Sequence, residues 1–410
     1  MGRSGRDALR GLGLSGGGAP ASVLRVSAAG EPGYAAAVAL AVLGAGVGRE
    51  EEPDGCDSGG VDGGGDWCGR VHRWWVVQRL LDRGYRVRAC VRGADDLEKT
   101  GFLREMAGYA SGRLTLHSAN LDEDGCFDEI FKGCQGVAHV SHVSTYTDAD
   151  DVRRVCDHII ASVNESDSVN RVIVTSSIAA VMDEADITEL ARRPVLYEDR
   201  IPDEQNPRRT AERKGYSMGK VVAERAFAEA AAASGGRWDA ITCCPADNVG
   251  PLLSAHQRQG AWQGRIAEML EGHYEQTAGY RPWMTVDVRD TADSQIGLLE
   301  SVVVQNGERY IAWSAEKRNV EDVCASIGRL LPELGHDAPS VTDPFPDRIQ
   351  AREAEFRAIW AGTELRNERM CAVAQMEFRP LDESIRDCVE SLITVGGVVP
   401  KLREGFALRA

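Results

Sequence analysis

Residues 76–93 have the sequence VVQRLLDRGYRVRACVRG, which gives the strongest indication of the fold class. Its first half carries apolar residues at helical spacing and closes on Gly84, a residue suited to the end of a helix. Its second half has the composition of a short strand. Further strands, separated by helical segments, are predicted at residues 113–121, 136–143 and 171–177. Alternating strands and helices predict an α/β protein with a doubly wound parallel sheet and helices on both faces.

The composition excludes several other classes of protein. The chain has 410 residues, of which 43% are apolar and 27% charged, as in ordinary globular domains. A net charge of -16 argues against a nucleic-acid partner, which requires a basic face. The longest apolar run, residues 34–48, is too short to cross a bilayer, so no membrane partner is expected. The 11 cysteines show no zinc-ligand spacing, which predicts a cytoplasmic protein without a metal site.

The distribution of glycine divides the chain. Residues 1–60 are rich in Gly and Ala, cannot bury much apolar surface, and are expected to be disordered. Residues 61–250 carry the alternating pattern and form the predicted dinucleotide-binding domain. Residues 251–410 are more helical and less repetitive, which predicts a smaller, mostly helical substrate-binding region.

One helix carries the residues with chemistry. The segment KGYSMGKVVAERAFAEAAA begins at Lys214, and helical spacing places Tyr216 and Lys220 on one face. A phenol donates a proton near neutral pH only if its ionised form is stabilised, and a cation one turn away does this. Ser177 ends a predicted strand, at the edge where α/β sheets bind ligands. The alternative is an ordinary surface pair on an amphipathic helix. Because lysine is scarce in this chain, we favour the catalytic interpretation.

The chain resembles the extended short-chain dehydrogenase/reductases, within them the dihydroflavonol reductase and cinnamoyl-CoA reductase group. The matching segments run in family order from about Trp74 to Lys401. They are VVQRLLDRGYRVRACVR, RVIVTSSIAAV, YSMGKVVAE, ITCCPADNVGP, VDVRD, GERYI and FRPLDESIRDCVESLITVGGVVP. The resemblance implies a Rossmann-type fold and a nicotinamide cofactor. It also implies reduction of a ketone, aldehyde or acyl-CoA carbonyl, or oxidation of the matching alcohol, by a monomer or homodimer.

Residue by residue, the resemblance implies four positions at the reacting end of the cofactor. Ser177 would position the substrate oxygen, and Tyr216 would donate the proton. Lys220 would bind the nicotinamide ribose and lower the pKa of the tyrosine. Pro245 would lie beside the nicotinamide ring.

Three further positions concern the adenosine end. Arg92 follows the second strand, where enzymes that prefer NAD usually carry an acid, and its guanidinium can pair with a 2′-phosphate. Lys99 matches a second phosphate-binding position of the family. Asn120 stands near the adenine, where the family usually has Asp. NADP(H) is therefore favoured over NAD(H). A solvated charge at a strand end is the alternative for Arg92.

Two departures from the family pattern limit the prediction. Met182 stands five residues after Ser177, where dihydroflavonol reductases carry an asparagine that contacts the flavonoid, so flavonoid specificity is not expected. The family's glycine loop, TGAxGYIG, aligns with DWCGRVHR, which has Trp67, Arg70 and Arg73 at the glycine positions. These side chains should obstruct the diphosphate, which needs close backbone approach at a helix N-terminus.

A shifted reading frame accounts for the missing loop. Trp67 is always encoded by TGG and Cys68 always begins with T, so the codon that begins one base later is GGT, which encodes glycine. Across residues 63–75 the shifted frame allows VVVTGAxGYIGG, a strand followed by the expected loop. We hypothesise that residues up to about Trp74 are translated in the wrong frame. The alternative is a true but divergent N-terminal segment.

Two other functions remain open at this point. The altered loop favours a catalytically impaired dinucleotide-binding protein, which Ser177, Tyr216 and Lys220 oppose. A sugar-nucleotide epimerase or dehydratase also carries the YxxxK motif, so fold and motif alone do not exclude it.

Overall fold

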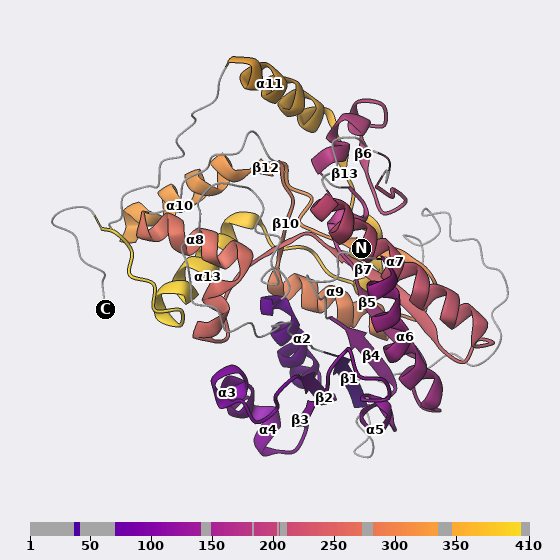
Figure 1. Cartoon of the computed structure of the whole chain (residues 1–410). Coiled ribbons are helices and arrows are strands. Elements are labelled where there is room, and N and C mark those ends of the chain that lie inside the picture. Colours follow the sequence, from indigo (N-terminus) through magenta and orange to yellow (C-terminus); the bar gives the residue numbers. More distant parts are fainter. Residues whose placement is uncertain are drawn as a thin grey trace, which may run out of the picture.

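A computed structural model describes residues 37–41, 70–140, 149–182, 184–202, 205, 211–272, 282–334 and 347–402 of the chain. Its main feature is a sheet of seven parallel strands in the order β11-β7-β5-β4-β1-β2-β3 (Figure 1). The strands are β1 (Ala37–Ala41), β2 (Arg86–Val91), β3 (Leu114–Ser118), β4 (Gly136–His139), β5 (Arg171–Thr175), β7 (Asp239–Pro245) and β11 (Arg309–Ala312). The order reverses between β1 and β4, as in a doubly wound sheet. The predicted Rossmann-type fold is confirmed.

The central strand β1 corrects one expectation. It lies within residues 1–60, which we expected to be disordered, and that expectation is wrong for these five residues. Ala37 pairs with Arg86 of β2, and Val38 pairs with Gly136 of β4, so β1 fills the middle of the sheet. The physical reason is that a parallel sheet needs a central strand with partners on both sides, and an apolar segment with small side chains supplies one. Residues 42–69, which connect β1 to the next helix, lie outside the described residues.

Helices cover both faces of the sheet. One face carries α2 (Arg70–Asp82), α9 (Val288–Glu300) and α12 (Glu368–Ala374), and the other carries α5 (Asp128–Phe131), α6 (Ala149–Glu165) and α7 (Ala211–Ala233). Alternate residues of β5 serve the two layers, with Ile173 in the core under α2 and α9 and with Val172 and Val174 in the core under α6 and α7. The sheet is therefore buried on both faces, as its continuous apolar strands require.

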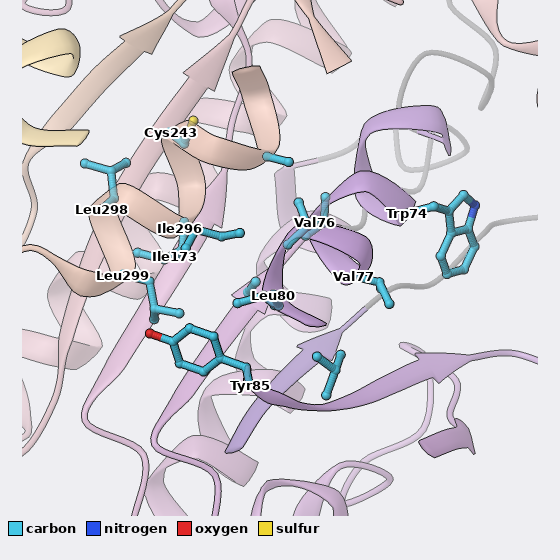
Figure 2. Close-up of a cluster of buried hydrophobic side chains, with 14 of the residues drawn as sticks. Trp74, Val76, Val77, Leu80, Tyr85, Ile173, Cys243, Ile296, Leu298 and Leu299 are labelled. Carbon is cyan, nitrogen blue, oxygen red and sulfur yellow. The ribbon is translucent and has the colours of Figure 1, made fainter. Parts of the chain in front are cut away.

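The packing of α2 against α9 fixes the start of the nucleotide-binding half. Figure 2 shows Val76 and Leu80 of α2 lying toward Ile296 and Leu299 of α9, while Trp74 lies on the far side of α2. Helix α2 ends before Gly84, whose φ of +87° is the left-handed conformation expected of a glycine that follows a helix. The chain then enters β2 directly, as its sequence predicts.

The remaining elements lie beside the sheet. Helices α8 (Ala261–Glu271), α10 (Val320–Leu334) and α13 (Leu381–Thr394) enclose a separate apolar core. Helices α3 (Leu97–Glu105) and α4 (Ala107–Ala110) follow β2, and α11 (Asp347–Gly362) packs on the 3-10 helix η2 (Glu184–Ala191). Three two-stranded sheets pair β6 (Val195–Leu196) with β13 (Glu364–Leu365), β8 (Asp247–Val249) with β10 (Thr285–Asp287), and β9 (Pro282–Trp283) with β12 (Arg318–Asn319). The 3-10 helices η1 (Ile178–Ala180) and η3 (Ala255–Gln259) complete the described structure.

The expected boundary at residue 250 does not separate the sheet from the C-terminal region. Strand β11 and helix α9 come from residues 251–410, yet β11 pairs with β7 and α9 packs on the sheet beside α2. The chain thus returns to the sheet after α8. Strand β11 pairs with the otherwise unpaired edge of β7, and α9 buries the apolar face of α2. The region beyond residue 250 is helical, as expected, and it is joined to the sheet by these two elements.

Candidate functional site

Ser177 lies just beyond β5, at the carboxyl edge of the sheet. The strand ends at Thr175, and the backbone of Ser177 is extended, with φ -158°. The Ser177 hydroxyl caps η1 by accepting a hydrogen bond of 3.2 Å from the amide of Ala179. Its side chain is half-buried. A hydroxyl held in this way by a short helical turn has a defined position at the edge where parallel sheets bind ligands.

Helix α7 brings Lys220 to the same strand end. The Lys220 ammonium donates a 3.1 Å hydrogen bond to the carbonyl oxygen of Thr175, two residues before Ser177. It lies 5.9 Å from the centre of the Tyr216 ring, as the one-turn spacing predicts. Lys220 is buried, whereas Tyr216 is half-buried. The structure therefore brings the lysine, the tyrosine ring and the end of β5 together.

Burial dominates the electrostatics of this lysine. It lowers the pKa of Lys220 from its ordinary value to about 8, while Cys156, Glu224 and Cys244 act in the opposite direction. An ammonium with such a pKa is still mostly charged at neutral pH. It has three donors, of which Thr175 takes one, so it can also serve ribose hydroxyls and a nearby phenolate.

Pro245 is the last residue of β7, the strand next to β5. It is buried and lies opposite Ala312 of β11. Because β5 and β7 are parallel, Pro245 and Ser177 fall at the same edge of the sheet. This half of the edge therefore carries the residues expected to face the nicotinamide.

Arg92 and Lys99 lie at the other half of the edge. Arg92 directly follows β2 and is exposed. Lys99 is in the first turn of α3, and its ammonium forms a 2.9 Å ion pair with Asp96, which caps that helix. The Asp96–Lys99 pair is solvent-exposed, so a phosphate can compete for the ammonium at small cost.

Asn120 follows β3, beside the end of β2. Its side-chain oxygen accepts a 3.3 Å hydrogen bond from the amide of Asp122, and its nitrogen lies 3.3 Å from a carboxylate oxygen of Glu123. Its carbonyl oxygen accepts from the Cys126 thiol at 3.0 Å. Asn120 is thus the first residue of a turn whose shape its own amide maintains.

The positions along the edge fit an extended dinucleotide. Asn120 and Arg92 stand at β3 and β2, whereas Ser177 and Pro245 stand at β5 and β7, with the reversal point of the sheet between them. Open α/β sheets bind ligands in the crevice at this reversal point. Since the donors at both ends suit a nicotinamide dinucleotide, the described residues fit that cofactor at its two nucleoside ends.

The first turn of α2 does not have the character of a glycine loop. Of the three residues at the family's glycine positions, Trp67 and the side chain of Arg70 lie outside the described residues. Arg73 is buried, and its guanidinium carbon lies 5.0 Å from the centre of the Trp74 ring. His72 is 3% exposed, and neither of its ring nitrogens has a hydrogen-bond partner. Burial, together with Arg73 and Lys220, lowers the pKa of His72 to about 3.

Three residues near the site have no role in the sequence analysis. His139 ends β4, and burial, reinforced by Lys220, lowers its pKa to about 3. Glu224 is buried on α7 one turn after Lys220, and Arg309 of β11 pairs with it. A weak signal existed for His139 and Glu224, since His139 lies within the strand predicted at residues 136–143 and Glu224 continues the Tyr216–Lys220 face by four residues. Arg309 gives no such signal, because its partner is remote in sequence.

Met182 is buried in an apolar cluster. It is 2% exposed and belongs to an apolar cluster with Trp313 and Trp360. A thioether suits this environment, because flexible apolar side chains fill irregular gaps in a core.

Among the described residues, no group of three His, Cys, Asp or Glu side chains is arranged to hold a metal ion. In the same part of the chain, the helices are all too short or too polar to cross a membrane.

No protein-family model matches the chain. Dihydroflavonol 4-reductase from Hordeum vulgare is 35% identical over 284 residues, covering 67% of this chain and 76% of the relative. Cinnamoyl-CoA reductase CAD2 from Medicago truncatula is 28% identical over 329 residues, covering 78% of this chain and 91% of the relative.

Solved structures share the fold. Yeast methylglyoxal/isovaleraldehyde reductase Gre2, complexed with NADPH, has a TM-score of 0.63 at 21% identity, covering 80% of this chain and 97% of its own. MoeE5, in complex with UDP-glucuronic acid and NAD, has a TM-score of 0.56 at 16% identity and covers the same shares.

The doubly wound sheet and the Tyr216–Lys220 helix at its carboxyl edge define a class, the NAD(P)-dependent oxidoreductases with a Rossmann fold. The Hordeum vulgare relative narrows this class. The chain belongs to the extended short-chain dehydrogenase/reductase family, and the predicted resemblance is confirmed.

Proposed function

We propose that the chain is an NADP(H)-dependent reductase of a small-molecule ketone, aldehyde or acyl-CoA carbonyl, or oxidises the corresponding alcohol. The observation that carries this proposal is the buried Lys220 ammonium, which bonds the end of β5 and lies one helical turn from Tyr216. A nicotinamide, when bound, supplies or accepts the hydride at the carbonyl carbon.

Each residue has a distinct task in this proposal. The Ser177 hydroxyl donates a hydrogen bond to the substrate oxygen and holds it near the phenol. Tyr216 transfers its proton to that oxygen as negative charge develops there. Lys220 stabilises the resulting phenolate, since a cation favours the ionised form of a neighbouring acid. In the oxidative direction, the same groups act in reverse.

The preference for NADP(H) is carried by Arg92. It is exposed at the end of β2, where a guanidinium can make a charge-assisted pair with a 2′-phosphate. Lys99 would add a second cation to this site. Its ammonium would leave the carboxylate of Asp96 and pair with the 2′-phosphate instead. NAD(H) remains the alternative and would be favoured if Arg92 faced solvent only.

Kinetics with a substrate panel test the proposal. Phenolic aldehydes, acyl-CoAs and dihydroflavonols are offered with NADPH, and UDP- and dTDP-sugars are offered separately. Reduction of a carbonyl compound, abolished in Tyr216→Phe, supports the proposal. Conversion of a nucleotide sugar alone would contradict it and assign the chain to the epimerase or dehydratase branch. MoeE5, whose structure contains UDP-glucuronic acid, is a neighbour on that side.

A second candidate is a dinucleotide-binding protein with impaired catalysis. His72 favours it, because a buried imidazole with two unpaired nitrogens stands in the first turn of α2, where the family's loop needs an apolar residue. From Trp74 onward, the same helix packs well with apolar side chains. This change in packing coincides with the proposed frame boundary near residue 74, and it supports the frame hypothesis.

Calorimetry with NADPH distinguishes the active reductase from the chain with an impaired cofactor site. The chain as written is compared with a version carrying VTGAAGYIGG in place of residues 65–74. Tight binding by the repaired version alone favours the frame hypothesis and an impaired chain. Micromolar or tighter binding by the written chain would refute it, and the first turn of α2 would then be a working phosphate site. The nucleotide sequence gives an independent test, since codons incompatible with VTGA in the shifted frame exclude the hypothesis.

A further inference from the structure

A buried ion pair between Glu224 and Arg309 lies next to the candidate site. Glu224 is 7% exposed on α7, four residues after Lys220 and on the same face of the helix. Its Oε2 lies 2.7 Å from Nε of Arg309, which comes from the edge strand β11. Burial raises the pKa of Glu224, and the charge of Arg309 opposes this. A buried carboxylate of this kind is tolerable only with such a partner.

The carboxylate of Glu224 is bonded to the first residue of the loop that carries Ser177, which we define as residues 176–180. The Ser176 hydroxyl donates a hydrogen bond to Oε1 of Glu224, and Ser176 is itself buried. The preceding residue, Thr175, accepts the hydrogen bond of Lys220. Consecutive residues of one strand end are thus fixed by two residues of α7 that stand one turn apart.

The guanidinium of Arg309 is bonded to the last residue of the same loop. Arg309 donates a 2.6 Å hydrogen bond to the carbonyl oxygen of Ala180, the last residue of η1. It also donates to the carbonyl oxygens of Glu198 and Arg200, at 2.8 Å and 2.7 Å. The several N–H donors of the Arg309 guanidinium therefore link η1 to residues 198–200, which follow β6.

We propose that the Glu224–Arg309 pair is a positioning device that sets the Ser177 hydroxyl against Tyr216 and Lys220. Residues 176 and 180 flank the serine, and each is tied to one member of the pair. The pair is in turn attached to the helix that carries the tyrosine and the lysine. Loss of the pair would leave these elements folded and release the loop between them. This inference rests on the proposed function for its catalytic consequence, but not for the loop geometry.

Glu224→Gln and Arg309→Lys test the pair, with Glu229→Gln as the matched control. Glu229 is on the same helix, and its side chain is 66% exposed, so its loss should change little. Amide hydrogen exchange is followed in residues 175–182. The amides of Ser176, Ala180 and Met182 donate there to the carbonyl oxygens of Cys243, Ser177 and Ile178. Exchange is expected to accelerate about tenfold in both test variants and to stay unchanged in α3 and in the control.

Kinetics supply the second measurement. With the carbonyl substrate found in the panel, kcat is expected to fall about tenfold or more in the test variants, with KM for NADPH within about twofold. Ser176→Ala removes one hydrogen bond and keeps the ion pair, so it covers the case in which Glu224→Gln fails to fold. It should accelerate exchange in residues 175–182 about threefold and lower kcat less.

Three results would overturn the inference. The first is unchanged exchange in residues 175–182 in every variant that folds, and the second is equal acceleration throughout the chain. The third is faster local exchange with unchanged kcat, which would show that the order of the loop does not matter to the chemistry. If the unsubstituted chain reduces no carbonyl compound, the proposed function fails, and the exchange data still decide whether the pair positions the loop.

Discussion

Replacing His72 with isoleucine should stabilise the protein. The His72 side chain is 3% exposed, and both ring nitrogens are without hydrogen-bond partners. One of these nitrogens carries a proton that has no acceptor, and the other has no donor. An unsatisfied buried polar group costs about 1–3 kcal/mol, whereas an apolar side chain of similar size carries no such penalty. We therefore expect His72→Ile to raise the free energy of unfolding at pH 7.5 by about 1–3 kcal/mol.

The gain should increase in acid. Burial, with Arg73 and Lys220, lowers the pKa of His72 from 6.5 to about 3 in the folded chain. Between these values the unfolded chain binds one more proton than the folded chain, so the His72 protein loses stability as the pH falls below 6.5. At pH 5 the loss is about 2 kcal/mol, since each pH unit corresponds to ~1.4 kcal/mol. Isoleucine removes this loss, and the advantage of the variant at pH 5 should reach about 3–5 kcal/mol.

Urea unfolding at pH 7.5 and pH 5.0, followed by tryptophan fluorescence, measures both quantities. His139 titrates in both proteins and cancels in the difference. His256 is exposed, and His256→Gln serves as the control, with an expected change within about 0.5 kcal/mol. If His72→Ile is no more stable at pH 7.5 and keeps the full pH dependence, His72 is not a buried neutral imidazole. The packing argument for a boundary near residue 74 would then fail with it.

Four other predictions concern the site. Tyr216→Phe should lower kcat/KM about 10²–10⁴-fold while leaving NADPH binding intact in calorimetry, because only the proton donor is lost. Arg92→Ala should weaken NADPH binding about 10–100-fold and leave NADH binding unchanged; equal losses for both would refute the 2′-phosphate contact. Because the pKa of Lys220 is about 8, kcat should fall as the pH rises through that value, and Lys220→Arg, if active, should flatten this limb of the pH profile. Met182→Asn should destabilise the fold by about 1–3 kcal/mol in thermal or urea unfolding, without gain on dihydroflavonols, because the position is buried among apolar side chains.

Several elements could be predicted because their signals are local. Helix α2 and strand β2 follow from the spacing of apolar residues in 76–93, and Gly84 has the left-handed conformation that its place predicts. The strand that leads to Ser177 follows from its short run of β-branched residues, although β5 ends at Thr175 and the prediction ran to Ser177. The proximity of Lys220 to the Tyr216 ring follows from one turn of helix.

The central strand β1 was not predicted, although a signal was present. Residues 34–48 form the longest apolar run, and a short apolar run is also consistent with a buried strand. Its alanines and the glycines around it suggested disorder, since neither residue type favours strands. Strand β1 is held instead by ladders to β2 and β4 on its two sides, and these depend on segments distant in the sequence.

Residue order alone specifies the alternation of strands and helices, the face shared by Tyr216 and Lys220, and the family to which the chain belongs. The first two depend on residue spacing within single elements, where helix and strand geometry is fixed by a few neighbouring residues, and family membership depends on the order of matching segments along the chain. Three features depend on long-range contacts: Ala37–Ala41 is the central strand, His72 is buried without hydrogen-bond partners, and Glu224 and Arg309 bond residues 176 and 180 on either side of Ser177. Ser176 and Glu224 are 48 positions apart, and Arg309 is a further 85 from Glu224. Such contacts arise from the order in which strands join the sheet, which no local pattern specifies.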